Sequence, residues 1–446
     1  MNQQHSLNAF AFGLRHVALA SALCCASLAQ AQVPPPGVTL YGLIDVGITS
    51  VSGLKGGTVT QVASGIMEGS RWGLKGSEDL GGGYKTIFTL ESRVEADTGA
   101  MSNRPVSGRQ LSDRLSDAKL LGLTSPSPQL QAVYQSAVNG VDALIASKFG
   151  VNLDNNVFDR QAYVGLITPF GAILAGRQYT PAYETFATFD TMATESALSA
   201  GQVAQFPAAF EIRNSNALAY RIVKNGFSGS VMYAPGEQND SGAISLFGAN
   251  FSYKTDVFSV GIGYNRKNNE LGDDSLNSTV LGASMNFGSG SKVNALVSTF
   301  KDDHPTGLSG IAASLAPVLS APPPNGVGPT LGPVIASDVQ DAFIEAFKQD
   351  AVLYHIGYRN VTGPHTVSLA YNHYDDTRPA NADVTSYGVA YSYALSKRTD
   401  LNAIAVRFDN KNLAQSAPGG NGYLGGVTKS AATDSTGLAF GIRHRF

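Results

Sequence analysis

Cysteine is almost missing from this chain. Its two examples, Cys24 and Cys25, lie close to the start. Around them, Arg15 precedes an apolar run from Val17 to Leu28, and Ala29-Gln30-Ala31 fits a small-x-small cleavage pattern. We therefore predict a signal peptide over residues 1–31 and a mature chain over residues 32–446. Because that mature chain has no thiol, disulfides, zinc–thiolate sites and cysteine nucleophiles are excluded.

Charge and long apolar runs are also scarce. Only 15% of the residues are charged, and residues 32–446 carry 30 Lys and Arg against 34 Asp and Glu, because Arg15 is the one Lys or Arg before residue 32. A net charge of −4 leaves no basic footprint, so we predict no nucleic-acid partner. After residue 31, no segment offers the roughly 20 continuous apolar residues that a membrane-spanning helix needs.

No motif supports a cofactor or catalysis. The turn Gly81–Gly83 precedes a strand-like segment, so it lacks the helix N-terminus that a phosphate site uses. Asp302-Asp303-His304 and His373–Asp376 are the local clusters of acids with histidine, and both lie at loop edges, where solvated side chains are the usual explanation. We predict no enzyme activity, no metal site and no cofactor. Binding of Ca²⁺ by these aspartates stays open as an alternative.

What the sequence does contain is alternation with a period of two. Over residues 38–51, Leu40, Ile44 and Ile48 share one parity, whereas Tyr41 and Asp45 take the other, which indicates a strand with one apolar face. Segments of this kind recur sixteen times: 38–51, 70–76, 84–95, 158–166, 172–179, 216–221, 227–234, 243–253, 257–265, 277–287, 292–300, 351–361, 365–375, 384–394, 400–409 and 436–446.

The connections between these segments alternate between short and long. The long ones are near 52–69, 98–157, 180–215, 235–242, 266–276, 301–350, 376–383 and 410–435. An even number of strands with short turns at one end and long loops at the other is typical of an outer-membrane barrel. We predict an all-β fold, a 16-stranded antiparallel transmembrane β-barrel with short periplasmic turns and long extracellular loops, over residues 32–446.

Two of the long loops contain helical patterns. In the 98–157 loop, a helix is predicted over residues 128–149, after Ser127. The 301–350 loop holds a proline-rich run from Pro317 to Pro333, followed by a predicted helix over 338–348. Two interpretations stay open at this point. Both loops could be flexible decoration, or they could pack across a neighbouring subunit.

The third long loop, residues 180–215, is predicted to fold into the lumen and narrow it. It is too long for an ordinary connection in a compact domain. Phe186, Phe189, Phe206 and Phe210 indicate that it packs against something. We expect this loop to be the constriction of the channel.

Charge marks the inner face of the barrel, because an Arg or Lys facing lipid near the midplane costs about 2–4 kcal/mol. The charged parity of each strand is therefore expected to face the lumen, with Leu40, Ile44, Trp72, Phe88 and Leu90 facing lipid. The predicted lumen-facing charges are Asp45, Arg71, Lys75, Lys85, Glu91, Arg93 and Arg160, with Arg213 at a strand edge.

Six stretches resemble one family, the general diffusion porins of Gram-negative outer membranes. They are Leu40–Asp45 (LYGLID), Gly69–Leu80 (GSRWGLKGSEDL), Arg160–Leu166 (RQAYVGL), Gly176–Tyr179 (GRQY), Arg213–Asn216 (RNSN) and Arg443–Phe446 (RHRF). The resemblance runs from the first strand to the last. It implies a barrel that forms a homotrimer, in which acids on the third loop face arginines on the wall.

Carried over by motif, the wall arginines are Arg71, Arg160 and Arg213. The PEFGG run of enteric members has no counterpart here, so the acids of the loop are left as three candidates, Glu184, Asp190 and Glu195, with Glu211 as a further one. The terminal aromatic, Phe446, is implied as an assembly signal.

The function that these expectations support is passive diffusion of small hydrophilic solutes and ions through a water-filled channel. The chain would lie in the outer membrane, against lipid and lipopolysaccharide. Three arginines with Lys75 and Lys85 favour a weak preference for anions. The alternatives are a substrate-specific channel of the same architecture, a barrel enzyme, and a surface adhesin that uses the long loops.

Overall fold

The computed structural model describes residues 37–446, except for residues 107, 109, 149, 205–210, 237–241, 289 and 420–424. The predicted signal peptide, residues 1–31, lies outside the described residues, as do Phe206 and Phe210. Among the residues described, no helix combines the length and the apolar character that crossing a membrane requires.

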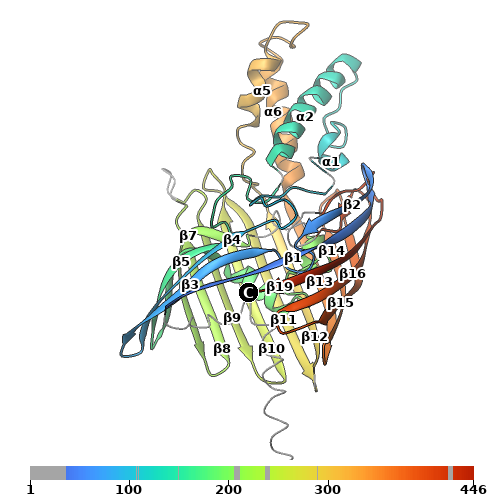
Figure 1. The fold of residues 1–446 in the computed structure, drawn as a ribbon. Coiled ribbons are helices and arrows are strands. Elements are labelled where there is room, and N and C mark those ends of the chain that lie inside the picture. Colours follow the sequence, from blue (N-terminus) through green and yellow to red (C-terminus); the bar gives the residue numbers. More distant parts are fainter. Residues whose placement is uncertain are drawn as a thin grey trace, which may run out of the picture.

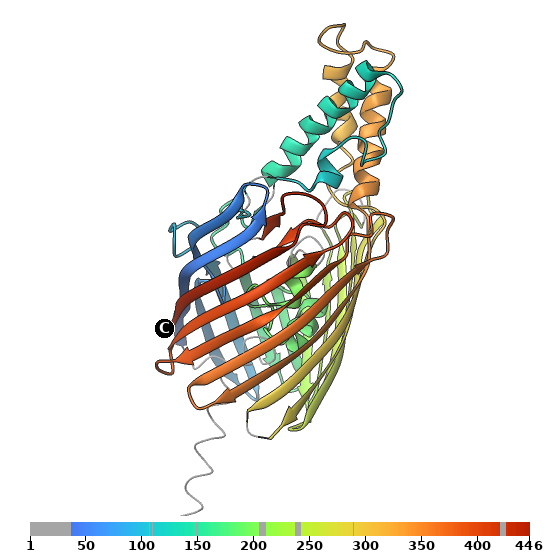
Figure 2. The same ribbon diagram turned by 90° about the vertical axis from the view of Figure 1, so that its right-hand side faces the viewer.

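Long antiparallel strands form the wall of a closed barrel (Figures 1 and 2). Consecutive wall strands pair with each other, apart from β2 and β3, which both pair with β1. β19 pairs with β1, with Asp45 opposite Arg443, so that the sheet closes on itself. The wall strands are β1 (Gly37–Leu54), β2 (Gly57–Ser64), β3 (Arg71–Gly81), β4 (Tyr84–Arg93), β5 (Gln161–Thr168), β6 (Gly171–Tyr179), β7 (Arg213–Lys224), β8 (Phe227–Ala234), β9 (Leu246–Lys254), β10 (Phe258–Asn268), β11 (Asp274–Phe287), β12 (Ser291–Asp302), β13 (Gln349–Thr362), β14 (His365–Asp376), β15 (Val384–Ala394), β16 (Thr399–Asn410) and β19 (Ser435–Arg445). The short strands β17 (Ser416–Ala417) and β18 (Gly426–Val427) pair with each other in the last long connection.

The wall has sixteen strand positions, although the sheet contains seventeen strands, because β2 and β3 share one position. β3 pairs with Gly37–Leu43 of β1, and β2 pairs with the part of β1 from Val46 onward. The predicted sixteen-stranded antiparallel barrel is confirmed.

The predicted long loop over residues 52–69 is wrong. Residues 57–64 continue the wall as β2, and the chain leaves the wall only between Ser64 and Arg71. The segment Thr58–Ala63 (TVTQVA) has little apolar alternation, so its pattern alone did not indicate a strand. Its ladder of hydrogen bonds to the long β1 holds it in the sheet.

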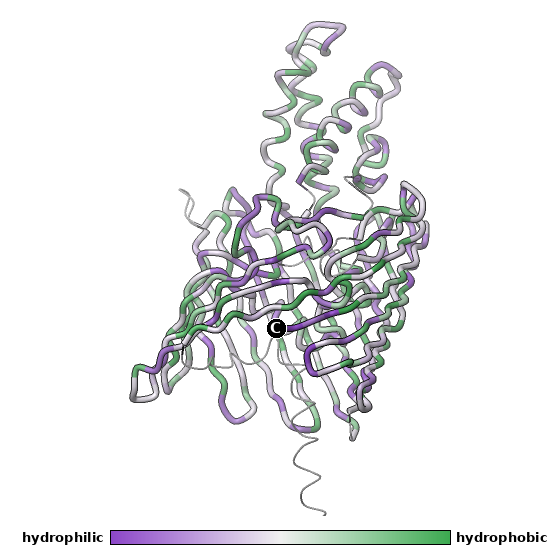
Figure 3. Tube along the Cα trace, viewed as in Figure 1, coloured by the Kyte–Doolittle hydropathy of each residue, from purple (hydrophilic) through white to green (hydrophobic). Residues whose placement is uncertain are grey.

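Alternation sorts the side chains between the two faces of the wall, and hydrophobic and hydrophilic residues accordingly follow one another along the strands (Figure 3). On β1, Leu40 and Ile48 point outward and are 58% and 57% exposed, whereas Leu43 and Asp45 point inward and are buried. The outer face is therefore apolar, and the charged and polar side chains of the strands gather inside.

Helices from two long connections rise together from one rim of the barrel (Figure 2). The connection between β4 and β5 contributes α1 (Asp113–Ser116) and α2 (Pro128–Lys148), and the connection between β12 and β13 contributes α5 (Ile311–Leu319) and α6 (Gly332–Phe347). We call these four helices the helical cap. Helices α2, α5 and α6 share an apolar core with the chain between α1 and α2. It is built from Ala118, Leu123, Ala137, Val138, Val141, Leu319, Ile335, Ala336, Val339 and Phe343.

Polar contacts also join the two halves of the cap. The Tyr134 hydroxyl of α2 donates to Asp338 Oδ2 of α6 at 2.7 Å, and Arg114 Nη1 donates to the carbonyl of Ala346 at 2.9 Å. The two loops thus pack on each other within one chain.

The helix predicted over 128–149 matches α2, apart from Phe149, which lies outside the described residues. The helix predicted over 338–348 starts six residues too late, because α6 begins at Gly332. Pro333 fits the first turn of α6, where a proline removes no helical hydrogen bond. The proline-rich run from Pro317 to Pro333 therefore includes the end of α5, with Pro317 inside that helix, and the start of α6.

Replacing Phe343 by Ala should loosen the helical cap while leaving the barrel intact. The Phe343 side chain is fully buried in the core of the cap, and such a truncation costs about 3–5 kcal/mol. Limited proteolysis of the folded protein should therefore cut the cap faster, with unchanged far-ultraviolet circular dichroism from the strands. Val334→Ala, at a side chain that is 55% exposed, serves as the control. Equal cleavage rates for the two variants would contradict a cooperative core.

Candidate functional site

The connection between β6 and β7 runs inside the barrel over its described residues, 180–204 and 211–212, and we call these residues the inner loop (Figure 2). It contains α3 (Pro181–Phe189) and α4 (Ala200–Val203). α3 lies against β9, β10, β11 and β12, and Phe186 and Phe189 are fully buried in the apolar cluster between loop and wall. The loop therefore occupies part of the lumen and is packed on one side of it.

Polar side chains of the wall fix the start of α3. Asn265 of β10 accepts a hydrogen bond from the amide of Ala182 at 3.2 Å and donates one to Thr180 Oγ1 at 2.8 Å. Asn250 of β9 donates to the carbonyl of Pro181 at 3.1 Å. The bond to Ala182 satisfies an amide at the helix N-terminus that has no partner within the helix, and the other two bonds fix the helix start against the wall.

Asp190 ends α3 and organises the turn that follows. Its fully buried carboxylate accepts hydrogen bonds from the Thr194 amide at 2.8 Å and from Ser199 Oγ at 2.6 Å. Ala193, Thr194 and Ser196 all have positive φ, a backbone conformation that needs such support in residues other than glycine. Asp190, a predicted channel acid, is thus used by its own loop and does not face the wall arginines.

His355 of β13 attaches the same turn to the wall. The amide of Thr191 donates to His355 Nε2 at 3.0 Å, so this nitrogen carries the lone pair, and Nδ1 then donates to Asn372 Oδ1 at 2.6 Å. Asn372 of β14 donates onward to the carbonyl of Leu198 at 3.2 Å. Two neighbouring strands therefore hold both sides of the turn.

Glu184, the second predicted acid, bonds elsewhere as well. Its carboxylate pairs with Arg221 of β7 and accepts a hydrogen bond from Asn250 Nδ2 at 3.4 Å. Glu211 pairs with Lys267 of β10 at 2.5 Å. Both acids tie the inner loop to its own side of the wall.

The three predicted arginines form a connected set on β3, β7 and the segment before β5. Glu91 lies between two of them, with Oε1 at 2.7 Å from Arg160 Nε and Oε2 at 3.5 Å from Arg71 Nε. The Tyr179 hydroxyl accepts hydrogen bonds from Arg160 at 3.2 Å and from Arg213 at 2.9 Å, and the guanidinium of Arg213 stacks on the Tyr179 ring. The structure thus brings the three arginines together, and Glu91 and Tyr179 join them.

Glu195 is the one of the three predicted acids that lies against this charged wall. Its Oε2 is 3.7 Å from Arg443 Nη1 of β19. The neighbouring Glu68, in the segment between β2 and β3, pairs with Arg71 and accepts from Arg443 at 3.0 Å and Arg445 at 3.1 Å. Arg443 also pairs with Asp400 of β16 at 2.7 Å. Glu195 therefore brings the inner loop next to the arginines of the wall.

The site also contains Glu68, Asp400, Arg443 and Tyr179, which the sequence does not mark as site residues. Glu68 falls within the predicted outer loop 52–69, and it reaches the site because residues 57–64 form β2. A signal for Arg443 was present, because it takes the parity opposite to the outward-facing Phe440.

Burial and neighbouring charges shift the pKa values of the Glu195 and Glu68 carboxyl groups in opposite directions. Burial raises the pKa of Glu195, the adjacent Glu68 carboxylate raises it further, and Arg443, Arg71 and Arg359 oppose both, so that it reaches about 8. Burial also opposes ionisation of Glu68. Arg71, Arg443 and Arg445 outweigh that effect and lower its pKa to about 2. At neutral pH Glu68 is thus ionised and Glu195 is protonated.

The other predicted lumen charges lie around this cluster. Asp45 accepts hydrogen bonds from the amides of Met67 at 2.8 Å and Glu68 at 2.7 Å, and so shapes the segment that carries Glu68. Lys75 lies over the Tyr41 ring. The remaining pairs lie further along the wall: Arg93 with Glu95 and Asp159, and Lys85 with Asp79.

The two acid–histidine clusters at loop edges are hydrogen-bonded locally. Asp302 accepts from Ser275 Oγ at 3.0 Å, and His304 Nδ1 is 2.8 Å from the carbonyl of Asp274. His373 Nδ1 lies 2.9 Å from Thr385 Oγ1. In the part of the chain that the structure describes, no group of three or more His, Cys, Asp or Glu side chains is placed to hold a metal ion.

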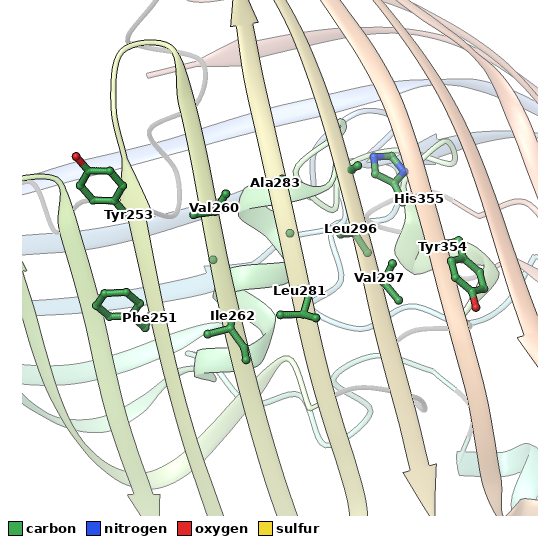
Figure 4. Close-up of a pocket in the computed structure, with 13 residues that line it drawn as sticks. Phe251, Tyr253, Val260, Ile262, Leu281, Ala283, Leu296, Val297, Tyr354 and His355 are labelled. Carbon is green, nitrogen blue, oxygen red and sulfur yellow. The ribbon is translucent and has the colours of Figure 1, made fainter.

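An apolar groove of about 600 Å³ lies on the outer face of the wall (Figure 4). Val260, Ile262, Leu281, Val297 and Tyr354 line it, and all five point outward from their strands. The groove therefore faces away from the lumen and is separated from the charged site by the wall.

Comparison with known proteins shows one consistent likeness. Residues 17–413 match the model of the Gram-negative porin family. The chain is 24% identical to outer membrane porin protein 32 of Delftia acidovorans, over 95% of this chain and 98% of that protein. It is 29% identical over 173 residues to an outer membrane porin protein of Bordetella pertussis, a match that spans 36% of this chain and 38% of that protein.

Solved structures show the same fold. An anion-selective porin from Comamonas acidovorans superposes with a TM-score of 0.63 at 22% identity, over 92% of this chain and 99% of that chain. OmpT of Vibrio cholerae, in its trimer form, gives a TM-score of 0.55 at 12% identity with the same coverage.

Replacing Asp190 by Asn should destabilise the inner loop locally. The amide nitrogen of Asn would face N–H and O–H groups, such as those of Thr194 and Ser199, that now donate to the Asp190 carboxylate. A buried donor left without an acceptor costs about 1–3 kcal/mol. Amide hydrogen exchange over residues 191–200 should accelerate, while exchange in the strands stays unchanged. Asp154→Asn, at an exposed loop position, is the matched control. Unaltered exchange at the Thr194 amide would contradict this role.

Proposed function

This chain belongs to the Gram-negative porin family, and we infer that its inner loop and the facing arginines form the constriction of its channel. It is an outer-membrane diffusion channel for small hydrophilic solutes. The wall side of the constriction would consist of the connected arginines Arg71, Arg160 and Arg213. Glu195 would be the acid of the loop, because Glu184 and Asp190 are engaged elsewhere.

The observation that carries this proposal is the approach of the inner loop, through Glu195, to a wall that holds clustered arginines and the carboxylates of Glu68 and Asp400. Charges fixed around a narrow, water-filled passage with low-dielectric walls produce a focused field. Ions and polar solutes orient in such a field, whereas an apolar solute must displace oriented water. Passage would thus be passive and would favour small hydrophilic molecules.

A weak preference for anions follows from the balance of charge at the constriction. Five arginines surround it, and of the four carboxyl groups there Glu195 is protonated at neutral pH. The arginines are Arg71, Arg160, Arg213, Arg443 and Arg445, and the acids are Glu68, Glu91, Asp400 and Glu195. A basic surplus attracts anions and repels cations. An anion preference also agrees with the likeness to the solved structure of an anion-selective porin.

General diffusion is favoured over the substrate-specific alternative by the position of the aromatic side chains. Tyr179 and Tyr183 stack on each other at 5.2 Å, and both are engaged, Tyr179 with two arginines and Tyr183 with Thr194. They do not form an open aromatic track for a solute. We further propose a homotrimer in outer-membrane lipid, with Phe446 as an assembly signal, and the trimer form of the similar OmpT structure supports the oligomer.

Replacing Arg71 by Ser should shift ion selectivity toward cations. The variant loses one positive charge, yet Glu68 keeps Arg443 and Arg445, and Glu91 keeps Arg160, so the site should stay assembled. In a planar bilayer with a tenfold KCl gradient, where perfect selectivity gives about 59 mV, the reversal potential should move by several millivolts. Lys301→Ser, a charge that is exposed at the end of β12, is the control. Identical reversal potentials for Arg71→Ser and the wild type would overturn the assignment, and three-level closure in the same recordings reports the trimer.

The anion preference should fall as pH rises from 7 to 9. The pKa of Glu195 is raised to about 8, so its carboxyl group is neutral below that pH and adds a negative charge above it. This charge appears beside Arg443 and Glu68, with Arg71 and Arg359 nearby, and it offsets part of the basic surplus. Reversal potentials measured across this range should show the change in the wild type and not in Glu195→Gln. A Glu195→Gln channel with the same pH dependence would assign the titration to another group.

A further inference from the structure

Glycines line the wall where the inner loop lies closest to it. They occupy inward-facing positions on four strands: Gly248 on β9, Gly261 and Gly263 on β10, Gly282 on β11 and Gly357 on β13. Gly261 and Gly282 are direct partners in the β10–β11 ladder. We call these five residues the glycine seat.

No side chain fits between these positions and the loop. A Cβ atom at Gly282 would lie 2.2 Å from the Phe189 ring, and one at Gly261 would lie 2.8 Å from the same ring. At Gly263 it would meet Thr185 Oγ1 at 2.5 Å and the Ala182 backbone at 2.9 Å. At Gly357 it would meet Thr191 Oγ1 at 2.2 Å. The loop therefore rests directly on the backbone of the wall at Pro181, Ala182, Thr185, Phe189 and Thr191.

The backbone itself does not require glycine here. None of the five has a positive φ, and the strands around them are regular at Gly261, Gly263 and Gly282. Glycine weakens a strand, because it has no side chain to pack and loses more conformational entropy than other residues. A glycine inside a strand often marks a close approach of another segment, and here that segment is the inner loop.

We propose that the glycine seat sets the width of the channel by fixing how deeply the inner loop lies in the wall. This proposal rests on the channel function proposed above. Packed side chains cannot absorb an added methyl group without moving. A methyl group at Gly282 would push Phe189, and with it α3, toward the lumen. The seat is a set of positioning residues that touch the loop and not the solute.

The test is single-channel conductance of Gly282→Ala in planar bilayers. A narrower passage should lower the single-channel conductance below that of the wild type, because an overpacked contact displaces its neighbour. The matched control is Gly229→Ala, which also replaces a strand glycine of the wall. A Cβ there meets no inner-loop atom, its nearest neighbour being the Asn250 carbonyl at 3.3 Å. Equal conductance of Gly282→Ala and Gly229→Ala overturns the seat.

A double variant identifies the contact. In the Phe189→Gly background, both the ring and the Phe189 Cβ atom, which would lie 2.6 Å from the added methyl group, are absent. Adding Gly282→Ala there should change the conductance little, which is strong non-additivity between neighbours. The same loss of conductance in both backgrounds would place the effect in the strand and overturn the proposal. If Gly282→Ala alone does not fold, rescue of folding by Phe189→Gly supports the seat, and a double variant that still fails counts against it.

The two proposals fail in different ways. A wild-type protein that conducts no ions in a bilayer refutes the channel. If the wild type conducts ions and Gly282→Ala has the same conductance, the proposal on the glycine seat is refuted and the channel function is not.

Discussion

Pairing of β1 with β19 is the interaction on which the rest of the structure depends. In hydrocarbon, each unpaired N–H or C=O group costs several kcal/mol, so a sheet inside a membrane must close. Closure sets Asp45 opposite Arg443 and Val51 opposite Gly437. It also brings Glu68 and Arg71, near the start of the chain, beside Arg443 and Arg445 at its end. The charged surface that faces the inner loop is thus produced by the topology of the wall.

The strands could be predicted because lipid and water impose a rule on every second residue, as Leu40 and Asp45 illustrate. Motifs then indicated Arg71, Arg160 and Arg213. The partners of these residues could not be predicted, because proximity across a barrel depends on register between segments hundreds of residues apart. Local composition was also misleading in places. Asp190 resembles a channel acid in sequence, yet the backbone of its own loop uses both oxygens. The weakly patterned Thr58–Ala63 is a strand only because β1 is long enough to pair with it.

The inner loop is held in two physically distinct ways. Directional hydrogen bonds from Asn250, Asn265 and His355 fix its orientation along the wall. Steric fit to glycines fixes its distance from the wall. The hydrogen bonds satisfy polar groups that burial would otherwise leave unpaired. The steric fit excludes other loop positions, because loop atoms would overlap with atoms of the wall. A loop restrained in both respects presents Glu195 at a constant position.

The helical cap has a mechanical consequence. Its two halves leave the wall between β4 and β5 and between β12 and β13, eight strand positions apart in a barrel of sixteen. These two points lie at opposite ends of one diameter of the rim. A ring of strands is most easily deformed by flattening into an ellipse, and a tie across a diameter resists that deformation. The apolar core around Phe343 and the bond between Tyr134 and Asp338 form such a tie. The mouth of this barrel is therefore braced against ovalisation by a strut that is made from its own loops.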